Sequence, residues 1–196
     1  MNIDRETIDR LIHALSMDGF QGEVETDSAL RATMSTDNSV YQIFPDIVVA
    51  PRDEADVVAL MRVLDLPDFA DLPLTARGGG TGTNGQSLNH GIILDFRRHM
   101  SRLLQVNAEE QWADVEPGMV LDDLNERLAP HGLFFAPETS TSTRCTIGGM
   151  VSTDASGKGS RIYGKTSDNI AGLEIARSNG VLSSLASPHP SGAEYR

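Results

Sequence analysis

Five glycines within nine residues form the part of this sequence whose residue types are best suited to chemistry. Residues 77–85 read RGGGTGTNG and directly follow an apolar stretch. Glycine loses more conformational freedom on folding than any other residue, so such a cluster indicates that the backbone must approach something closely. Backbone N–H groups turned inward in a loop of this kind form a nest for a phosphate or diphosphate. The alternative is a surface turn that only needs positive φ angles.

Two familiar phosphate-binding motifs do not account for this loop. Residues 80–85 match G-x-G-x-x-G, but the dinucleotide fingerprint also needs a helix directly after it and an acidic residue about 20 positions further on. Residues 86–91 instead predict a turn that leads to a strand, and Gln105 stands where the acid belongs. A P-loop would need a lysine after the last glycine, and this loop has none.

A second loop is also rich in hydrogen-bonding groups. Residues 137–164 read PETSTSTRCTIGGMVSTDASGKGSRIYG. This stretch is too polar to be core and too long to be a simple connection, and it contains a helix start near Gly148. The two loops lie about sixty residues apart and could therefore close around one elongated ligand.

The elements that must position these loops follow from the spacing of apolar residues. Residues 4–16 have apolar side chains at helical spacing and are followed by Gly19, which predicts an amphipathic helix. Residues 46–50 and 72–76 predict strands on either side of a helix that begins near Asp53, and this succession predicts a right-handed parallel crossover. The expected core face of that helix consists of Ala55, Val58, Met61 and Leu64.

Hairpins dominate the expected structure of the second half, whereas the polar residues 21–41 predict no element. The expected strands span residues 91–96, 103–107, 111–116, 132–136, 170–176 and 181–185. The second and third form a hairpin, and the last two flank an Asn179-Gly180 turn. Leu121, Leu124 and Leu128 mark a short helix that ends before Pro130. One parallel unit followed by hairpins favours the α+β class.

Composition and charge exclude several classes of function. The 196 residues suffice for one domain or two small lobes, and the net charge of −12 disfavours nucleic acid and anionic membranes as partners. A single cysteine, Cys145, excludes an internal disulfide and suits a reducing compartment. The sequence shows no secretory signal and no apolar run of about 18 residues, so we expect a cytoplasmic protein, with peripheral association at the inner membrane left open.

Individual reactive residues offer few further sites. The five histidines form no i, i+4 pair and no ligand spacing with Cys145, so we expect no metal site. Cys145 is expected to be a half-buried thiol, and Asp95 a turn former at the end of a strand. Arg77 either offsets the charge of a diphosphate or pairs with a surface acid. The absence of a G-x-S-x-G motif leaves a hydrolase without support.

Several segments together resemble one known family. They are the RGGGTGTNG loop, Pro137, the run Thr146-Ile147-Gly148-Gly149, the run Asp154-Ala155-Ser156-Gly157, and Tyr163-Gly164. This combination resembles the FAD-binding domain of the vanillyl-alcohol oxidase and p-cresol methylhydroxylase (PCMH-type) superfamily. It is most similar to the D-2-hydroxyacid dehydrogenases, which act on D-lactate, glycolate or D-2-hydroxyglutarate, and residues 36–42 and 45–51 share this similarity. The resemblance covers roughly residues 28–185.

The resemblance implies an FAD site built from both loops and no assigned catalytic residue. The first loop would surround the FAD diphosphate with backbone N–H groups through Arg77, Gly78, Gly79, Gly80, Thr81, Gly82, Thr83, Asn84 and Gly85. The second would follow the flavin and ribityl chain and complete the pocket towards the adenine through Pro137, Glu138, Thr139, Thr141, Thr146, Gly148, Gly149, Ser152, Thr153, Ala155, Gly157, Tyr163 and Gly164.

The resemblance also implies a domain plan and a larger protein. An N-terminal helix and extension would span residues 1–40, the FAD-binding domain residues 41–185, and a tail residues 186–196. The PCMH-type fold would consist of a small parallel βαβ lobe and a lobe with a mixed or antiparallel sheet and helices. Family members continue with a glycine-rich segment and a cap domain that contacts the substrate. We therefore expect a fragment of a larger FAD-linked oxidase, inactive alone, whose hydroxyacid substrate binds through a missing domain.

Two departures from the family pattern lead to specific expectations. Members that attach FAD covalently often carry histidine just after the RGGG stretch, whereas this sequence has Thr81, which implies non-covalent FAD. Asp154 stands where asparagine is common, and it should point away from the diphosphate or bond a ribose hydroxyl. The electron acceptor is open, and an iron–sulfur domain of the full-length chain is one candidate. The alternative functions are the FAD domain of a sugar or alditol oxidase, that of a cell-wall precursor reductase, and a non-enzymatic binding module.

Overall fold

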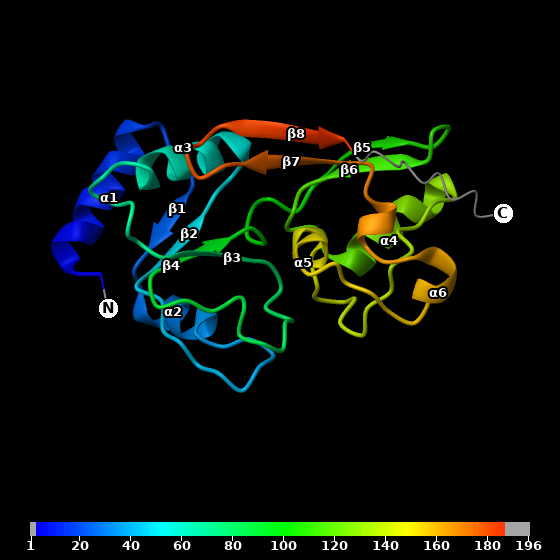
Figure 1. Ribbon diagram of the computed structural model, residues 1–196, viewed down its shortest axis with the longest axis horizontal. Coiled ribbons are helices and arrows are strands. Elements are labelled where there is room, and N and C mark those ends of the chain that lie inside the picture. Colours follow the sequence, from blue (N-terminus) through cyan, green and yellow to red (C-terminus); the bar gives the residue numbers. More distant parts are fainter. Residues whose placement is uncertain (1–2, 187–196) are drawn as a thin grey trace.

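The protein consists of two lobes that lie side by side along its longest axis (Figure 1). The structure is a computed structural model that describes residues 3–186, so the expected tail at 186–196 lies outside it except for Ala186. The helices are α1 (Arg5–Met17), α2 (Ser28–Met34), α3 (Glu54–Leu64), α4 (Leu121–Leu128), α5 (Ile147–Ser152) and α6 (Ser160–Tyr163), with the 3-10 turns η1 (Ala129–His131) and η2 (Ser167–Asn169). The strands are β1 (Glu23–Glu25), β2 (Ile47–Ala50), β3 (Leu74–Arg77), β4 (Ile92–Asp95), β5 (Leu103–Asn107), β6 (Trp112–Val115), β7 (Gly172–Ala176) and β8 (Leu182–Ala186).

A four-stranded mixed sheet forms the centre of the first lobe. Its strand order is β1-β2-β4-β3, with β2 and β3 both parallel to β4 and β1 antiparallel to β2. All residues of β2 and β4 are buried, because these strands lie inside the sheet with both faces covered. The predicted parallel unit of β2, α3 and β3 is confirmed, with β4 inserted between its two strands.

Helices α1 and α3 pack against each other and supply most of the apolar core of this lobe. Helix α1 begins at an Asp4 N-cap and buries Ile8, Leu11 and Leu15. Ile12, which shares their helical spacing and was expected on the same face, is exposed. Each fully buried leucine contributes about 1.5–3 kcal/mol relative to an exposed one. Strand β1 and helix α2 occupy the segment for which the sequence predicted no element.

The core face of α3 differs from the predicted one. Its buried residues are Asp56, Val57, Ala59, Leu60, Val63 and Leu64, so of the four expected residues only Leu64 is buried. The buried residues Val57, Leu60 and Leu64 also follow helical spacing. The buried carboxylate of Asp56 fixes this orientation, since it accepts hydrogen bonds from the backbone N–H groups of Gln21 and Arg52 at 2.7 and 2.8 Å. A pattern of apolar residues alone cannot place a polar residue on the buried side.

The second lobe combines the β5–β6 hairpin with helices α4 and α5 around a separate apolar cluster. The predicted hairpin and the short helix before Pro130 are both confirmed. The strand predicted at residues 132–136 is wrong, because no β-strand forms there. Instead the Asn125 side chain bonds the backbone of Phe135 on both sides, accepting from its N–H at 2.7 Å and donating to its C=O at 3.3 Å. A side chain thus replaces the missing partner strand.

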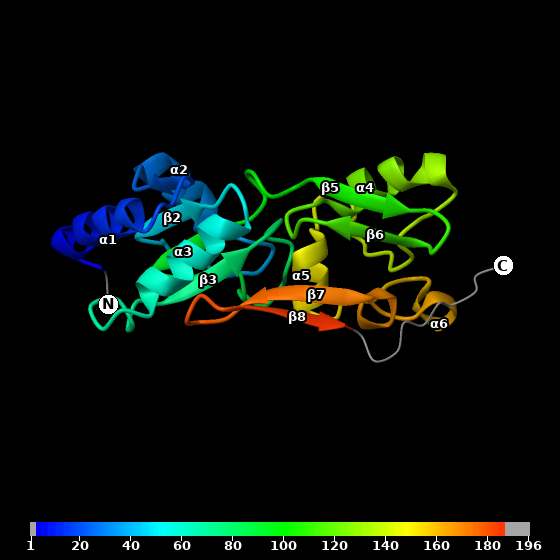
Figure 2. The same cartoon turned by 90° about the horizontal axis from the view of Figure 1, so that it is seen from above.

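The β7–β8 hairpin runs from the second lobe back to helix α3 of the first (Figures 1 and 2). Gly180 in its predicted turn has φ +73° and is buried. A Cβ atom there would lie 2.3 Å from Arg62 and 3.0 Å from the Val58 carbonyl oxygen, so the turn sits directly on α3. Among residues 3–186, no helix is long and apolar enough to cross a membrane.

Candidate cofactor-binding site

The glycine loop begins where β3 ends and lies on the side of the first lobe that faces the second. Residues 78–91 contain no helix, and strand β4 follows them. This confirms that the G-x-G-x-x-G match has no fingerprint helix behind it. Gly80 and Gly85 adopt φ of +61° and +75°, a region that other residues rarely enter.

The backbone N–H groups of this loop are available to a ligand. Within the described part of the chain, the amides of residues 78–83 donate no hydrogen bond to another group. The next amide, that of Asn84, donates to the Gln86 side chain at 3.1 Å. Residues 78–82 are half-buried and Thr83 is exposed, so these amides lie within reach of a ligand. A run of six consecutive unpaired amides therefore fits an anion that accepts several hydrogen bonds at once, such as a diphosphate.

Two glycines of the loop are required by the second loop rather than by a ligand. A Cβ atom on Gly78 would lie 2.0 Å from the Thr146 hydroxyl oxygen, and one on Gly79 would lie 2.0 Å from the Arg144 carbonyl oxygen. The two loops are therefore in direct contact at the start of α5, where Thr146 is the buried N-cap. The predicted convergence of the two loops is present in the structure.

Other predicted site residues of the second loop pack against each other. A Cβ atom on Gly157 would lie 1.3 Å from the Glu138 carbonyl oxygen, so this glycine holds the segment that begins at Pro137. The Thr139 hydroxyl lies 3.1 Å from the buried Cys145 thiol, and the Thr141 carbonyl accepts from the Cys145 N–H at 2.8 Å. Several polar groups in this segment thus bond within the protein, whereas the amides of residues 138–141 donate no hydrogen bond to another group of residues 3–186.

The helical part of the second loop uses its hydroxyls internally. Ser152 and Thr153 donate to the carbonyls of Gly148 and Gly149 at 2.8 and 2.9 Å. The Ala155 carbonyl accepts from both the N–H and the hydroxyl of Thr166. Helix α6, which includes Tyr163 and precedes Gly164, lies at the outer end of the second lobe (Figures 1 and 2). The structure does not bring α6 to the glycine loop.

Asp154 adopts φ +45°, a conformation that favours asparagine or aspartate among residues with side chains. Its carboxylate forms an ion pair with Lys165 and accepts the Ser167 N–H at 3.0 Å. The hydrogen bond from Lys165, with that from Ser167, lowers the pKa of Asp154 to about 2. The Lys165 ammonium thereby balances the charge of this ionised carboxylate at the surface of the second lobe.

Arg77, which was expected either to offset the charge of a diphosphate or to pair with a surface acid, makes its shortest hydrogen bond to a backbone carbonyl. It is only 8% exposed, and its guanidinium donates to the Thr36 carbonyl at 2.7 Å. Burial lowers the pKa of Arg77, while the charges of Asp37 and Asp95 act in the opposite direction. Asp95 accepts the Arg97 N–H at 2.9 Å, which confirms the expected turn-forming role. Burial raises the pKa of the Asp95 carboxyl.

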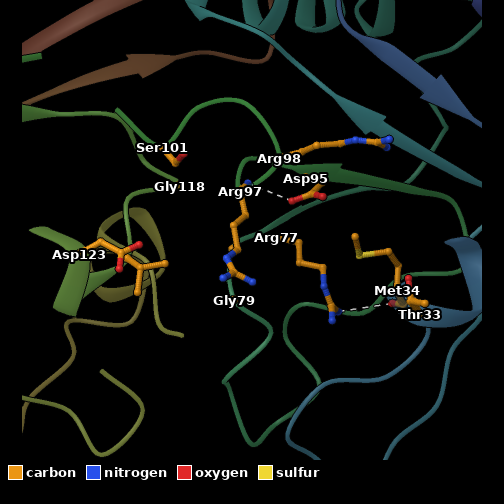
Figure 3. A pocket seen from close by; sticks show the side chains of 12 residues that line it. Thr33, Met34, Arg77, Gly79, Asp95, Arg97, Arg98, Ser101, Gly118 and Asp123 are labelled. Carbon is orange, nitrogen blue, oxygen red and sulfur yellow. Dashed lines mark hydrogen bonds between the residues drawn. The ribbon is translucent and has the colours of Figure 1, made fainter. Parts of the chain in front are cut away.

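A cavity of about 530 Å³ opens where the glycine loop meets both lobes (Figure 3). Arg97 and Arg98 bring positive charge to it, and Asp95 and Asp123 bring negative charge. The lining residues are Thr33, Met34, Arg77, Gly78, Gly79, Asp95, Arg97, Arg98, Ser101, Gly118, Val120 and Asp123. Sequence reasoning named only the three residues of the glycine loop as binding residues here, because the others come from separate segments with no common motif. Residues 3–186 contain no group of three or more metal-ligating side chains.

Comparisons with known proteins agree with this geometry. A family model described as an FAD binding domain matches residues 45–186. D-2-hydroxyglutarate dehydrogenase of Escherichia coli K12 is 53% identical over 171 residues, which are 87% of this chain but 17% of that protein. Glycolate oxidase subunit GlcD of Bacillus subtilis is 33% identical over 144 residues, covering 72% of this chain and 30% of that protein.

Solved structures with the same fold belong to proteins with several different names. Alkyldihydroxyacetonephosphate synthase superposes with a TM-score of 0.77 at 20% identity, covering 95% of this chain and 35% of that one. 6-Hydroxy-D-nicotine oxidase of Arthrobacter nicotinovorans superposes with a TM-score of 0.75 at 24% identity, covering 86% and 36%. These likenesses establish the fold and leave the reaction open.

Proposed function

This chain belongs to the FAD binding domain family, and from that premise we propose that it is the FAD-binding part of a dehydrogenase that oxidises a D-2-hydroxyacid. Its cofactor is FAD, and its PCMH-type α+β fold is the one that the sequence predicted. The chain spans 17% of the D-2-hydroxyglutarate dehydrogenase that it resembles at 53% identity. The activity therefore belongs to a longer protein, in which D-2-hydroxyglutarate is the first substrate to test.

The observation that carries this proposal is the run of six unpaired amides at residues 78–83 beside the contact with the second loop. FAD supplies the two-electron oxidation, whereas the protein binds and orients it. We assign the diphosphate to these amides, because neutral donors bind an anion without the repulsion expected in a protein of charge −12. The second loop closes one side through Arg144 and Thr146.

Thr81 supports non-covalent attachment of the cofactor. Its side chain is a hydroxyl, and no histidine lies in residues 77–85 to form a bond to the flavin ring. Denaturation of the FAD-loaded protein should release all of the flavin, and intact mass spectrometry should give the mass of the polypeptide alone. A flavin adduct that survives denaturation would overturn this assignment.

Titration with FAD, followed by quenching of flavin fluorescence, tests the binding function. We expect saturable binding by the wild-type chain and a large loss for Gly80→Ala, because a Cβ atom there has φ +61° and lies 2.5 Å from the Arg77 guanidinium. Gly132→Ala is the matched control: Gly132 has a similar φ of +72° and open space around it, and it follows η1 in the second lobe. Equal FAD affinities for the two variants would argue against this loop as the diphosphate site.

The substrate is tested on the full-length protein. Under anaerobic conditions, D-2-hydroxyglutarate should bleach the flavin absorbance more efficiently than D-lactate or glycolate. Preference for an alditol or a sugar lactone would favour the oxidase alternative, and bleaching by NADPH the reductase alternative. We further propose an electron acceptor within the complete protein, such as an iron–sulfur domain, and a cytoplasmic location. Metal analysis and cell fractionation test these two points.

A further inference from the structure

The two ends of the glycine loop are joined to each other by buried groups. Arg77 begins the loop and Ser87 follows it, and both are less than 10% exposed. The Arg77 guanidinium lies 3.4 Å from the Ser87 carbonyl oxygen and 3.5 Å from its hydroxyl oxygen. It also donates to the carbonyls of Met34 and Thr36, the former shown as a dashed line in Figure 3. Its donors thus point to the segment of Met34 and Thr36 and to Ser87.

Asp37 completes this arrangement from the segment that follows α2. Its carboxylate accepts the Ser87 hydroxyl at 3.0 Å and the Ser39 N–H at 2.8 Å. Burial acts to raise the pKa of Asp37, but hydrogen bonds from Ser39 and Ser87 and the charge of Arg77 hold this pKa below its usual value. The carboxylate is therefore ionised at neutral pH and holds the hydroxyl in place.

The same segment orients one peptide unit of the loop. The Asn38 N–H donates to the Gly80 carbonyl at 3.1 Å. In a trans peptide, the C=O of one residue and the N–H of the next point in opposite directions. The Thr81 N–H is therefore turned away from residues 36–38. The Arg77 guanidinium packs against Gly80, since a Cβ atom on Gly80 would lie 2.5 Å from the Arg77 Nη2.

We propose that Arg77, Asp37 and Ser87 form a bracket that holds the glycine loop in the shape that receives the FAD diphosphate, and that Arg77 acts as a positioning residue rather than a phosphate ligand. This inference rests on the proposed FAD site and adds the residues that preset it. A guanidinium can meet several carbonyls at once through its planar fork, which a lysine ammonium cannot reproduce. Geometry, and not charge alone, is then what this position requires.

Variants of Arg77, Asp37 and Ser87 distinguish a positioning residue from a phosphate ligand. The measurement is FAD affinity at low and high salt. Ser87→Ala and Asp37→Asn should each weaken FAD binding about tenfold, because each removes a hydrogen bond that involves a charged group. Arg77→Lys should bind FAD as weakly as Arg77→Gln, with the salt dependence of the wild type. Arg97→Gln is the control for charge, since Arg97 is an exposed arginine that lines the same cavity.

Either of two results would overturn the bracket. If Arg77→Lys restores the affinity and only Arg77→Gln flattens the salt dependence, Arg77 acts on the diphosphate through its charge. If Ser87→Ala and Asp37→Asn bind FAD like the wild type, the bracket does not shape the loop.

Hydrogen exchange of the Asn38 amide, followed by NMR without FAD, separates this inference from the proposed function. The bracket predicts faster exchange in Ser87→Ala and Asp37→Asn than in the wild type, because the bond to Gly80 loosens. Unchanged protection would overturn the bracket even if the wild-type chain bound no FAD. Failure of the wild type to bind FAD, with exchange accelerated as expected, would instead leave the bracket intact and remove the proposed cofactor function.

Discussion

The two loops that meet between the lobes satisfy their polar groups to different extents. The glycine loop leaves the amides of residues 78–83 unpaired while buried groups of the first lobe hold it from behind. The second loop bonds to itself, through Ser152 and Thr153, through the ion pair of Asp154 and through the Thr141 carbonyl. The second loop has a shorter run of amides without a hydrogen bond in the described chain, at residues 138–141. The first loop therefore offers the longer row of free donors, whereas much of the second loop supplies shape.

The largest loss of stability and FAD affinity should come from a substitution that fills the contact between the two loops. Gly79→Ala would place a Cβ atom 2.0 Å from the Arg144 carbonyl oxygen, whose backbone cannot move cheaply. We expect a loss of more than about 2 kcal/mol in unfolding free energy and a strong loss of FAD affinity.

Gly82→Ala is the matched control for that contact within the same loop. Its Cβ atom meets only the end of the flexible Gln86 side chain, so the change in stability should stay within about 0.5 kcal/mol. Urea denaturation and FAD titration of both variants measure the difference. Equal behaviour of the two would mean that the loops do not touch as described.

Removing a supporting side chain from the second lobe and one from the first should have different effects on stability and FAD affinity. Asn125→Ala deletes both bonds to the Phe135 backbone in the second lobe and should lower the unfolding free energy by about 1–2 kcal/mol. It should leave FAD affinity nearly unchanged, whereas Ser87→Ala should weaken FAD binding more than it lowers the melting temperature. Thermal melts and FAD titrations of both variants test this contrast, which a reversed pattern would contradict.

Acid should weaken the first loop through Asp37. Because its folded-state pKa is lowered, its stabilising contribution is present above the unfolded-state pKa and is lost as pH falls through the folded-state value. FAD affinity of the wild type should therefore fall in the acidic range below pH about 4. Asp37→Asn should show a smaller fall over the same range in parallel titrations. An identical fall in both proteins would assign the pH dependence to other groups.

The smallest effect is expected at the surface ion pair of the second loop. Lys165→Ala should raise the pKa of Asp154 from about 2 towards the ordinary aspartate value of 3.8, as followed by NMR of the carboxyl carbon. Stability should change little, because the pair is exposed and screened by salt. Any contribution from Asp154 should be present above pH 3.8 and vanish as pH falls towards 2. A large destabilisation at neutral pH would show that this pair holds the loop.

Local patterns sufficed for much of the fold and failed where distant groups intervened. The β5–β6 hairpin and α1 follow from residue spacing, since their side chains pack on near neighbours. Residues 132–136 looked like a strand because they are apolar, yet their backbone is satisfied by Asn125 from α4. The core face of α3 was misjudged because Asp56 bonds the backbone of Gln21, 35 residues away.

The sequence by itself determined the α+β class, the glycine loop without a following helix, and the similarity to FAD-binding domains. These features depend on residue types and on short spacings within single segments of the chain. Only the tertiary structure decided that Gly78 and Gly79 serve the second loop, and that Asp37 and Ser87 close on Arg77 from positions 50 residues apart. Such contacts depend on where separate segments meet, and no pattern within either segment specifies that meeting.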